Sequence, residues 1–391
     1  MIRLCLISCL ALVLSGCVDS PNRPLPKDGL RPMGWIDVRL VTTRSTVDVA
    51  ATGAWSVYDN AGNETIDDGQ VSKKGRLSLR GDGLRLAGKP LGTLPLELRP
   101  RGKGQVIVEG VRYHGLLRLE RDADGALLVI NRVAVDDYLK GVLPGEMPDR
   151  FGQEALRAQA VAARSYALAE VAERGWVHPD ARSQVYGGVD AETFLASRAV
   201  SQTSGEVLTF ESRVITAWFH STCGGSTQPA RNMFRFAPSG VMDRFVPCKD
   251  CKDSSAYSWR RSIPGAEVCA AAGLPDGAKL LGVEPLEADF NGFPGRPARL
   301  LVRSDRGQAE IGANDLRSRV SRGKPTADQL LSTRWNQPAR VVSGRLVVNG
   351  NGWGHGVGLC QWGAGGHASR GASYRAILRR YYPGAELVKL S

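Results

Sequence analysis

The segment EALRAQAVAARSYALAEVAERG, residues 154–175, constrains the fold of this chain more than any other stretch. It is rich in alanine, has no glycine or proline before its last residue, and ends at Gly175. Alanine has the highest helix propensity, and glycine commonly follows the last turn of a helix. Because its many alanines let a neighbouring backbone approach closely, the segment predicts a long helix buried at the centre of a domain.

The region before this helix has the pattern of antiparallel sheet. Between residues 35 and 120, short β-branched runs such as IDVRLV and GQVIVEG alternate apolar and polar positions and are separated by glycine-containing turns. A period of two with frequent turns is typical of antiparallel strands. Strands return after residue 205, and a helix and a final strand end the chain. The predicted fold class is therefore α+β, with an antiparallel β-rich N-terminal region and a mixed domain around the long helix.

Two shorter helices are expected beside the long one. An amphipathic segment begins near Asp136, and the P-G-E-M-P sequence that follows is expected to end it, which leaves Glu146 in a turn. The other is expected over about residues 191–201. We divide the chain into a leader (1–17), a tether with four prolines (18–33), the β-rich region (34–120) and a mixed domain (121–391).

The first twenty residues, MIRLCLISCLALVLSGCVDS, predict export. Arg3 precedes an apolar run over residues 4–14, and LSGC resembles a bacterial lipoprotein cleavage box that would leave a lipidated Cys17 at the new N-terminus. The alternative is a plain secretory signal with a coincidental cysteine. Val18 follows Cys17 in place of the aspartate of an inner-membrane retention signal. We therefore expect a lipid-anchored envelope protein facing the periplasm, at the outer rather than the inner membrane.

The charge balance indicates an anionic partner. Lys and Arg number 51 against 39 Asp and Glu, for a formal charge of +12. Nucleic acid, acidic lipid and a carboxylate-bearing glycan all have the matching sign. No basic nuclear-type run, zinc-finger array or RNA-binding motif occurs in the sequence, so no nucleic-acid partner is expected.

Four polar clusters from distant parts of the chain are candidates for one cleft. They are Glu146 in PGEMP; Gln159, Arg164, Ser165 and Tyr166 on the long helix; HSTCGG (220–225) with CKDC (248–251); and GNGWGHGVGLCQWGAGG (350–366).

DDYLKGVLPGEMPDRFGQEALRAQAVAARSYAL, QVYGG, HSTCGG and NGWGHGVGLCQWGA, in this order, resemble the SpoIID/LytB family of stage II sporulation protein D and amidase enhancers, from about residue 100 to 385. The resemblance implies a peptidoglycan lytic transglycosylase whose catalytic acid is Glu146. One carboxylic acid suffices for this reaction: it protonates the leaving oxygen and then accepts the proton of the muramoyl 6-hydroxyl, which closes a 1,6-anhydro ring. The alternative is that Glu146 only favours the dipole of the following helix.

Further residues are candidates for substrate binding. Arg164 and Tyr166 suit sugar hydroxyls or the lactyl carboxylate, and Gln159, Gln184 and Tyr186 are similar candidates; each of these side chains has a structural role as its alternative. In the glycine-rich segment, the aromatic rings of Trp353 and Trp362 suit sugar faces, and His355 and Gln361 suit hydroxyls. There the alternatives are a phosphate cradle, which lacks its motif, and a glycine-rich corner with His355 bonded to backbone.

The cysteines predict a structural zinc site. His220 and Cys223, followed by Cys248 and Cys251, have the spacing of a Cys3His site. Family members can carry a metal near the segment that matches HSTCGG. A disulfide from Cys223 to Cys248 or Cys251 is the alternative in an oxidising compartment, and Cys360 could replace His220 as the fourth ligand.

Two other functions remain open at the level of sequence. The chain could be an amidase enhancer that grips glycan or an N-acetylmuramoyl-L-alanine amidase without cleaving glycan, or an envelope scaffold whose β-rich half docks a partner. For the enzyme, the resemblance implies a substrate that an amidase has already stripped of stem peptides.

Overall fold

The computed structural model describes residues 34–59, 64–68, 75–81, 83–234, 240–286, 292 and 294–390. The leader, the tether and Cys17 lie outside these ranges. Contacts between Cα atoms group the described residues into two compact units, one of residues 34–216 with 387–390 and one of residues 217–386. Among the described helices, none is both long and apolar enough to span a bilayer.

The first unit contains two six-stranded sheets of antiparallel pairs. One sheet has the order β1 (Trp35–Thr43), β12 (Leu127–Ala134), β11 (Leu116–Arg121), β8 (Leu96–Pro100), β3 (Trp55–Tyr58), β4 (Glu64–Asp68). The other has the order β10 (Val111–Tyr113), β9 (Val106–Val108), β2 (Thr46–Ala51), β5 (Gly75–Arg80), β6 (Gly83–Leu86), β7 (Lys89–Thr93).

The alternating sequence pattern explains these sheets. On β11 the buried residues are Leu117 and Leu119, with partly exposed residues between them, as the period of two requires. β12 is buried along most of its length and pairs with both β1 and β11. The predicted domain boundary near residue 120 falls at the end of β11, and β11 pairs with β12 on the other side of that boundary. The two compact units instead divide after residue 216.

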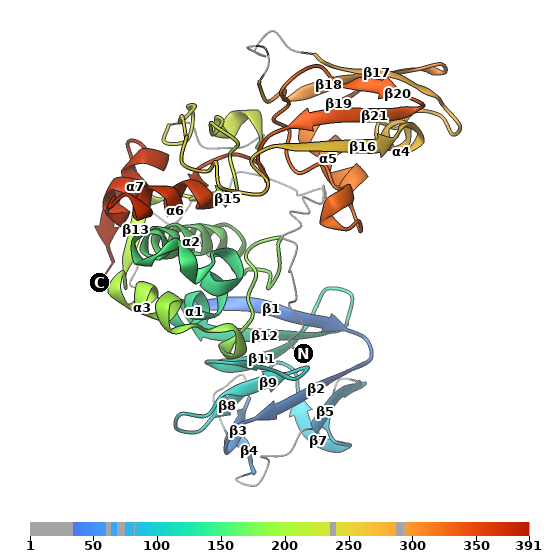
Figure 1. Cartoon of the computed structure of the whole chain (residues 1–391). Helices are drawn as coiled ribbons and strands as arrows, with labels where there is room; N and C mark the ends of the chain where they lie inside the picture. The colour runs from blue at the N-terminus through green and yellow to red at the C-terminus, as the bar shows by residue number, and fades with distance from the viewer. Residues whose placement is uncertain are drawn as a thin grey trace, which may run out of the picture. The chain divides into compact units, whose positions relative to one another are not determined.

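Three helices follow these sheets in the unit: the first two contact strands β1 and β12, and the third packs against the first two. They are α1 (Val135–Glu146), α2 (Gln153–Arg174) and α3 (Phe194–Gln202), shown side by side in green in Figure 1. Short 3-10 turns occupy Asp149–Phe151 and Val189–Ala191. A small sheet has the order β14 (Arg213–Val214), β13 (Glu206–Phe210), β23 (Glu386–Lys389).

The long helix is confirmed. α2 ends at Arg174, and Gly175 caps it in the left-handed region with φ of 82°. Most of its alanines are buried, and α1, α3 and β13 all contact it. The small alanine side chains therefore allow these neighbouring elements to pack closely against α2.

The second unit is built from small sheets (Figure 1). One has the order β16 (Trp259–Pro264), β21 (Arg345–Gly350), β20 (Arg340–Val342), and another has the order β17 (Leu280–Pro285), β18 (Arg299–Ser304), β19 (Gly307–Gly312). β17 contacts β20 and β21, and α4 (Gly265–Ala271) packs against strands of both sheets. Their facing sides form one apolar core that includes Leu300, Val302, Leu346 and Val348.

The remaining elements of this unit carry the cysteine and glycine motifs. β15 (Phe219–His220) pairs in parallel with β22 (Leu359–Cys360), which leads into α6 (Gln361–Ser369) and α7 (Tyr374–Tyr381). α5 (Ala313–Ser321) follows β19, and 3-10 turns occupy Ala230–Asn232 and Thr326–Asp328.

Candidate functional site

Glu146 is the last residue of α1, so the expectation that it lies in a turn is wrong. The helix continues through Pro144, which stands in the last turn. A proline there removes only one backbone hydrogen bond, because its N–H would have bonded to a single carbonyl in the preceding turn. Glu146 is half-buried, and its Oε1 accepts a hydrogen bond of 3.0 Å from the backbone N–H of Val185.

The loop of residues 184–188, the QVYGG motif, closes the end of α1. Gly187 N–H donates to the Gly141 carbonyl at 3.0 Å. A side chain at Gly141 would place its Cβ 2.8 Å from the Gly188 carbonyl oxygen and from the Tyr186 ring. Two motifs 40 residues apart are thereby brought together, and the glycines permit the approach that fixes the Glu146 carboxylate.

Two tyrosines share the electrostatic environment of Glu146. Burial raises the pKa of Tyr166 above its ordinary value, and the charges of Glu170 and Glu146 raise it further. Burial also raises the pKa of Tyr138, with a smaller contribution from Glu146. Tyr166 is half-buried whereas Tyr138 is fully buried. Of the α2 residues predicted to bind substrate, Tyr166 is the one whose surroundings include the Glu146 charge.

Arg164 and Gln159 are fully buried in α2. The Arg164 guanidinium donates to Asp136 Oδ1 at 2.8 and 3.1 Å and to the carbonyls of Glu206 and Val200 at 3.0 and 3.3 Å. These bonds connect α2 to α1, α3 and β13, which is the structural role that the sequence left open. The amide of Gln159 has no hydrogen-bond partner within the described part of the chain.

Gln184 and Tyr186 are also buried. Gln184 Oε1 accepts from the Tyr138 hydroxyl at 3.2 Å, and its Nε2 donates to the Ala163 carbonyl at 3.3 Å. The Tyr186 hydroxyl donates to Asn131 Oδ1 at 3.0 Å. Both side chains therefore hold the 184–188 loop against the helices and β12, and their contact with substrate stays a prediction.

In the second unit, the HSTCGG and NGWGHG segments pack directly against each other. Thr222 and Trp353 exchange backbone hydrogen bonds of 3.1 and 2.7 Å. Gly224 has φ of 72° and Gly352 has φ of 82°, and a Cβ on either would lie within 2.6 Å of backbone atoms of the other segment. The high glycine content of these two segments is explained by the close approach of their backbones to each other.

His355 uses both ring nitrogens on backbone groups. Its Nδ1 accepts from Val357 N–H at 3.1 Å, so Nε2 carries the proton and donates to the Phe219 carbonyl at 2.9 Å. Burial and the charges of Arg317 and Arg296 lower its pKa to about 3. The ring is thus a neutral structural element here. Trp353 is half-buried and Gln361 is buried at the start of α6.

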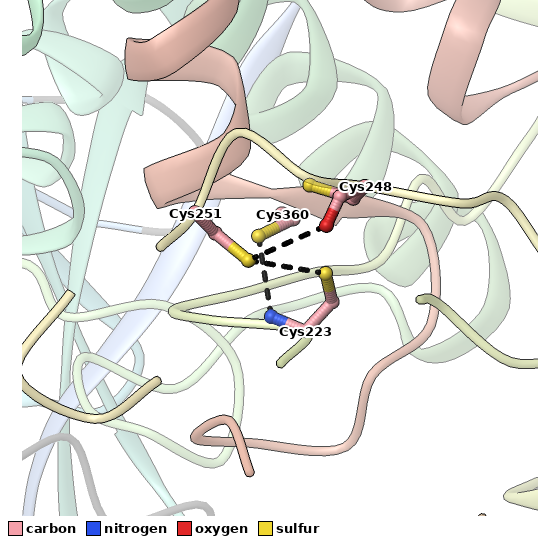
Figure 2. Close-up of side chains that lie close together, drawn as sticks. All are labelled: Cys223, Cys248, Cys251 and Cys360. Atoms are coloured by element: carbon pink, nitrogen blue, oxygen red, sulfur yellow. Dashed lines mark hydrogen bonds between the residues drawn. The ribbon is translucent and has the colours of Figure 1, made fainter. Parts of the chain in front are cut away.

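Four cysteines converge in this unit. The Sγ atoms of Cys223, Cys248, Cys251 and Cys360 lie within 4.8 Å of one another, and all four residues are buried (Figure 2). Cys223 Sγ and Cys251 Sγ are 3.5 Å apart, well beyond the ~2.05 Å of a disulfide bond. All five described cysteines are free. Cys360 therefore stands in the fourth position, for which His220 is the first candidate in the sequence analysis.

The cluster contains donors that favour thiolates. Hydrogen bonds from Cys223 lower the pKa of Cys248 to about 6 and lower the pKa of Cys251 far below its ordinary value, whereas burial raises the pKa of Cys360. Backbone N–H groups of Cys223 and Gly363 donate to Cys360 Sγ at 3.2 and 3.3 Å. Four buried sulfurs with N–H donors fit a tetrahedral zinc ion, which prefers thiolate ligands.

Helix α6 supports the 248–251 loop of the cluster, and its glycines allow the loop to lie close to it. A Cβ at Gly363 would lie 2.6 Å from Cys248 Sγ, and one at Gly366 would lie 2.2 Å from the Asp250 carbonyl oxygen. His367 and Arg370 on α6 pair with Asp250. The glycines in this helix are required because the loop lies against it.

His220 lies outside the four-cysteine group. Its Nδ1 contacts the Val357 carbonyl at 3.0 Å, and burial lowers its pKa well below the ordinary value. The signal that identifies Cys360 instead is the parallel pairing of β15 with β22, which sets His220 opposite Cys360. A pairing between segments this far apart in the chain has no trace in local spacing.

Comparisons with known proteins place this chain among sequence relatives. The family model described as "Stage II sporulation protein" matches residues 123–210, which include Glu146 and α2. An uncharacterized protein of Brachyspira hyodysenteriae is 31% identical over 72% of this chain and 73% of its own length. Stage II sporulation protein D of Bacillus subtilis is 28% identical over 66% of this chain and 75% of its own. The amidase enhancer of Bacillus subtilis is 28% identical over 64% of this chain, but only 40% of its own length is covered.

The chain is thus an α+β protein with a helix-supported carboxylate in one unit and a four-cysteine cluster in the other. It belongs to the SpoIID/LytB family of stage II sporulation protein D and amidase enhancers.

Proposed function

We propose that this protein is a peptidoglycan lytic transglycosylase that cleaves cell-wall glycan strands and leaves 1,6-anhydro-N-acetylmuramic acid ends. Family membership supports a role in the cell wall. The formal charge of +12 suits a glycan that carries muramoyl carboxylates.

The observation that carries this proposal is the support of Glu146. A carboxylate at the C-terminal end of a helix faces the negative end of the helix dipole, so stability alone does not favour it there. The 184–188 loop nevertheless holds it by a direct hydrogen bond, and its side chain remains partly exposed. Acting as an acid toward the leaving oxygen and then as a base toward the 6-hydroxyl, Glu146 needs no second carboxylate.

The experiment compares the wild type with Glu146→Gln on intact and on amidase-stripped peptidoglycan. We expect release of soluble glycan to fall by at least about 100-fold in Glu146→Gln, since this is the usual contribution of a general acid. Glu173→Gln is the matched control, because it removes an exposed carboxylate from neighbouring α2. Equal activity of the two variants would remove Glu146 from the catalytic role.

The second candidate is a glycan-binding amidase enhancer, which the similarity to an amidase enhancer favours. Its signature is retained glycan binding and stimulation of an N-acetylmuramoyl-L-alanine amidase, with no glycan release by wild type or variant. The same substrates therefore separate the two functions.

We also propose that Cys223, Cys248, Cys251 and Cys360 hold a structural zinc ion. A four-thiolate site leaves no open position for substrate, so the ion would stabilise the unit and take no part in cleavage. Elemental analysis of purified protein should find about one zinc per chain, which Cys360→Ser should lose. Cys269→Ser, which alters a buried free cysteine outside the group, and His220→Gln should both retain it. Loss of the metal in His220→Gln, with retention in Cys360→Ser, would instead indicate a Cys3His site with His220 as the fourth ligand.

The protein is further proposed to be exported and anchored in the envelope by lipid on Cys17. Cys17→Ala should move the protein from the membrane to the soluble fraction, whereas Cys9→Ala should not.

A further inference from the structure

Two buried arginines and one half-buried arginine of the second unit have no carboxylate partner in the described part of the chain. Arg296 and Arg317 are each only 7% exposed, and Arg334 is half-buried. Arginine is almost never buried without a pairing group, because an uncompensated charge in the interior is costly. The cluster therefore needs an explanation.

Backbone pairing holds two of these arginines opposite each other. Gly295 and Trp335 form an antiparallel bridge with two hydrogen bonds of 2.9 Å. Their neighbours Arg296 and Arg334 are consequently cross-strand neighbours, an arrangement in which like charges repel. Gly356 of the glycine-rich motif packs against Arg296, because a Cβ there would lie 2.6 Å from the guanidinium carbon.

The third arginine comes from α5. The first residue of this helix, Ala313, donates its N–H to the Ala298 carbonyl at 2.8 Å, which ties the helix to the segment between Arg296 and β18. Burial lowers the pKa of Arg296 to about 9, together with the positive charges of Arg334 and, less strongly, Arg317. Both other arginines thus add to the positive charge at Arg296.

Several N–H donors of this cluster are unused. Arg296 Nη2 donates to the Cys223 carbonyl at 2.9 Å, and Arg317 Nε donates to Asn314 Oδ1 at 2.8 Å. The buried atoms Nε and Nη1 of Arg296, Nη2 of Arg317 and Nε of Arg334 have no partner among the described residues. Guanidinium forks with free donors match the oxygens of carboxylate and phosphate groups.

Negative charge on the cysteine thiolates compensates only part of the positive charge of the three arginines. Cys223 interacts favourably with Arg296 and Arg334. Burial lowers the pKa of Arg317 to about 10, without a contribution from the cysteines. The thiolates also leave the four donor atoms without partners. A ligand with several acceptor oxygens satisfies both the charge and the donors.

We propose that Arg296, Arg317 and Arg334 form an oxyanion-binding site, for a carboxylate or phosphate group, beside the glycine-rich motif. Because Arg334 is half-buried, the oxyanion can reach the site from solvent beside this side chain. The bound oxyanion can be a free phosphate ion or the carboxylate of a sugar. The site stands independently of glycan cleavage, since its tests measure melting and the binding of small anions and involve no cleavage step.

The first test compares Arg317→Met with Arg322→Met, which removes the same charge from an exposed position at the end of α5. Replacing an unpaired buried charge by an apolar side chain is stabilising. We therefore expect Arg317→Met to melt at a higher temperature than the wild type in phosphate-free buffer at low ionic strength, and Arg322→Met to be unchanged. A lower melting temperature for Arg317→Met in this buffer would contradict the unpaired charge on which the proposal rests.

The second test adds inorganic phosphate, N-acetylmuramic acid or N-acetylglucosamine at millimolar concentration and measures melting temperature and binding by calorimetry. Phosphate or N-acetylmuramic acid, which has a lactyl carboxylate, should stabilise the wild type and Arg322→Met, and should bind Arg317→Met at least about tenfold more weakly. N-acetylglucosamine, which lacks the carboxylate, is the control. Equal responses of wild type and Arg317→Met, or no response of the wild type to either anion, would overturn the proposal.

Discussion

At the scale of single residues, Arg164 shows how a charge can be central to folding. Its guanidinium is fully buried and bonds to Asp136 and to two carbonyls. Removing one member of a buried ion pair strands the other, at a cost of about 3–5 kcal/mol. We expect Arg164→Met to lower the free energy of unfolding in urea by about this amount.

Arg157→Met is the control for this measurement. Arg157 pairs with Glu154 near the surface of the same helix, so its loss should cost within about 1 kcal/mol. Similar costs for the two variants would mean that the Arg164 pair contributes little to stability.

Glu170 makes a pH-dependent contribution to stability. Burial raises its pKa above the ordinary value for a glutamate, against the opposing charge of Arg174. As pH rises past about 4.5, the unfolded chain ionises first, so the folded state is progressively disfavoured until its own raised pKa is passed. The wild type should therefore lose stability relative to Glu170→Gln as pH rises from 4 to 7, in melting curves of the two proteins. A constant difference across this range would show that Glu170 ionises normally in the folded protein.

The site residues could be predicted only in part. Glu146 stands out from its PGEMP motif, and its half-buried position is consistent with the expected role. Gln184 and Tyr186 also stand out, but the structure buries them as supports of the 184–188 loop. A sequence motif does not distinguish a side chain that touches substrate from one that holds the neighbouring backbone, because both restrict the residue type.

At the scale of elements, α6 makes a test of close packing possible. Gly363→Ala should raise helix propensity by about 1 kcal/mol if the position were open. Its Cβ would instead lie 2.1 Å from the Tyr381 hydroxyl and 2.6 Å from Cys248 Sγ. We expect net destabilisation of about 1–3 kcal/mol in urea unfolding, together with weaker metal retention.

Gly53→Ala serves as the control substitution, because no heavy atom lies within 4 Å of its Cβ position. A Gly363→Ala protein as stable as the wild type would show that the 248–251 loop can move away from α6 without cost.

The elements with strong local periodicity are those that the sequence predicts. α2 and the strands of residues 35–120 follow from alanine content and from alternation. The end of α1 and helix α6 do not, because Pro144 and Gly363 oppose helix formation locally and packing contacts decide the outcome. Tertiary contacts of this kind are invisible in a local window of sequence.

At the scale of the whole molecule, the two units should respond separately to metal loss. All four cysteines of the group lie in residues 217–386. A bound metal stabilises only the folded form of the unit that binds it. A chelator should therefore lower the melting transition of this unit and leave that of residues 34–216 unchanged, as measured by calorimetry with limited proteolysis to assign each transition. A shift of both transitions would contradict this independence.

The family and the α+β class follow from ordered motifs in the sequence, whereas the division at residue 216 and the four-cysteine group depend on pairings between distant segments. β1 pairs with β12, and β15 pairs with β22, across roughly 90 and 140 residues of chain respectively. Such pairings are set by the packing of the completed fold.

The central claim is that Glu146 supports cleavage without water. The most direct measurement is digestion of amidase-stripped glycan in H₂¹⁸O, followed by mass spectrometry of the new ends. We expect anhydro ends that carry no ¹⁸O and that are absent from the Glu146→Gln digest. Reducing ends that carry ¹⁸O, or anhydro ends made equally by Glu146→Gln, would contradict it.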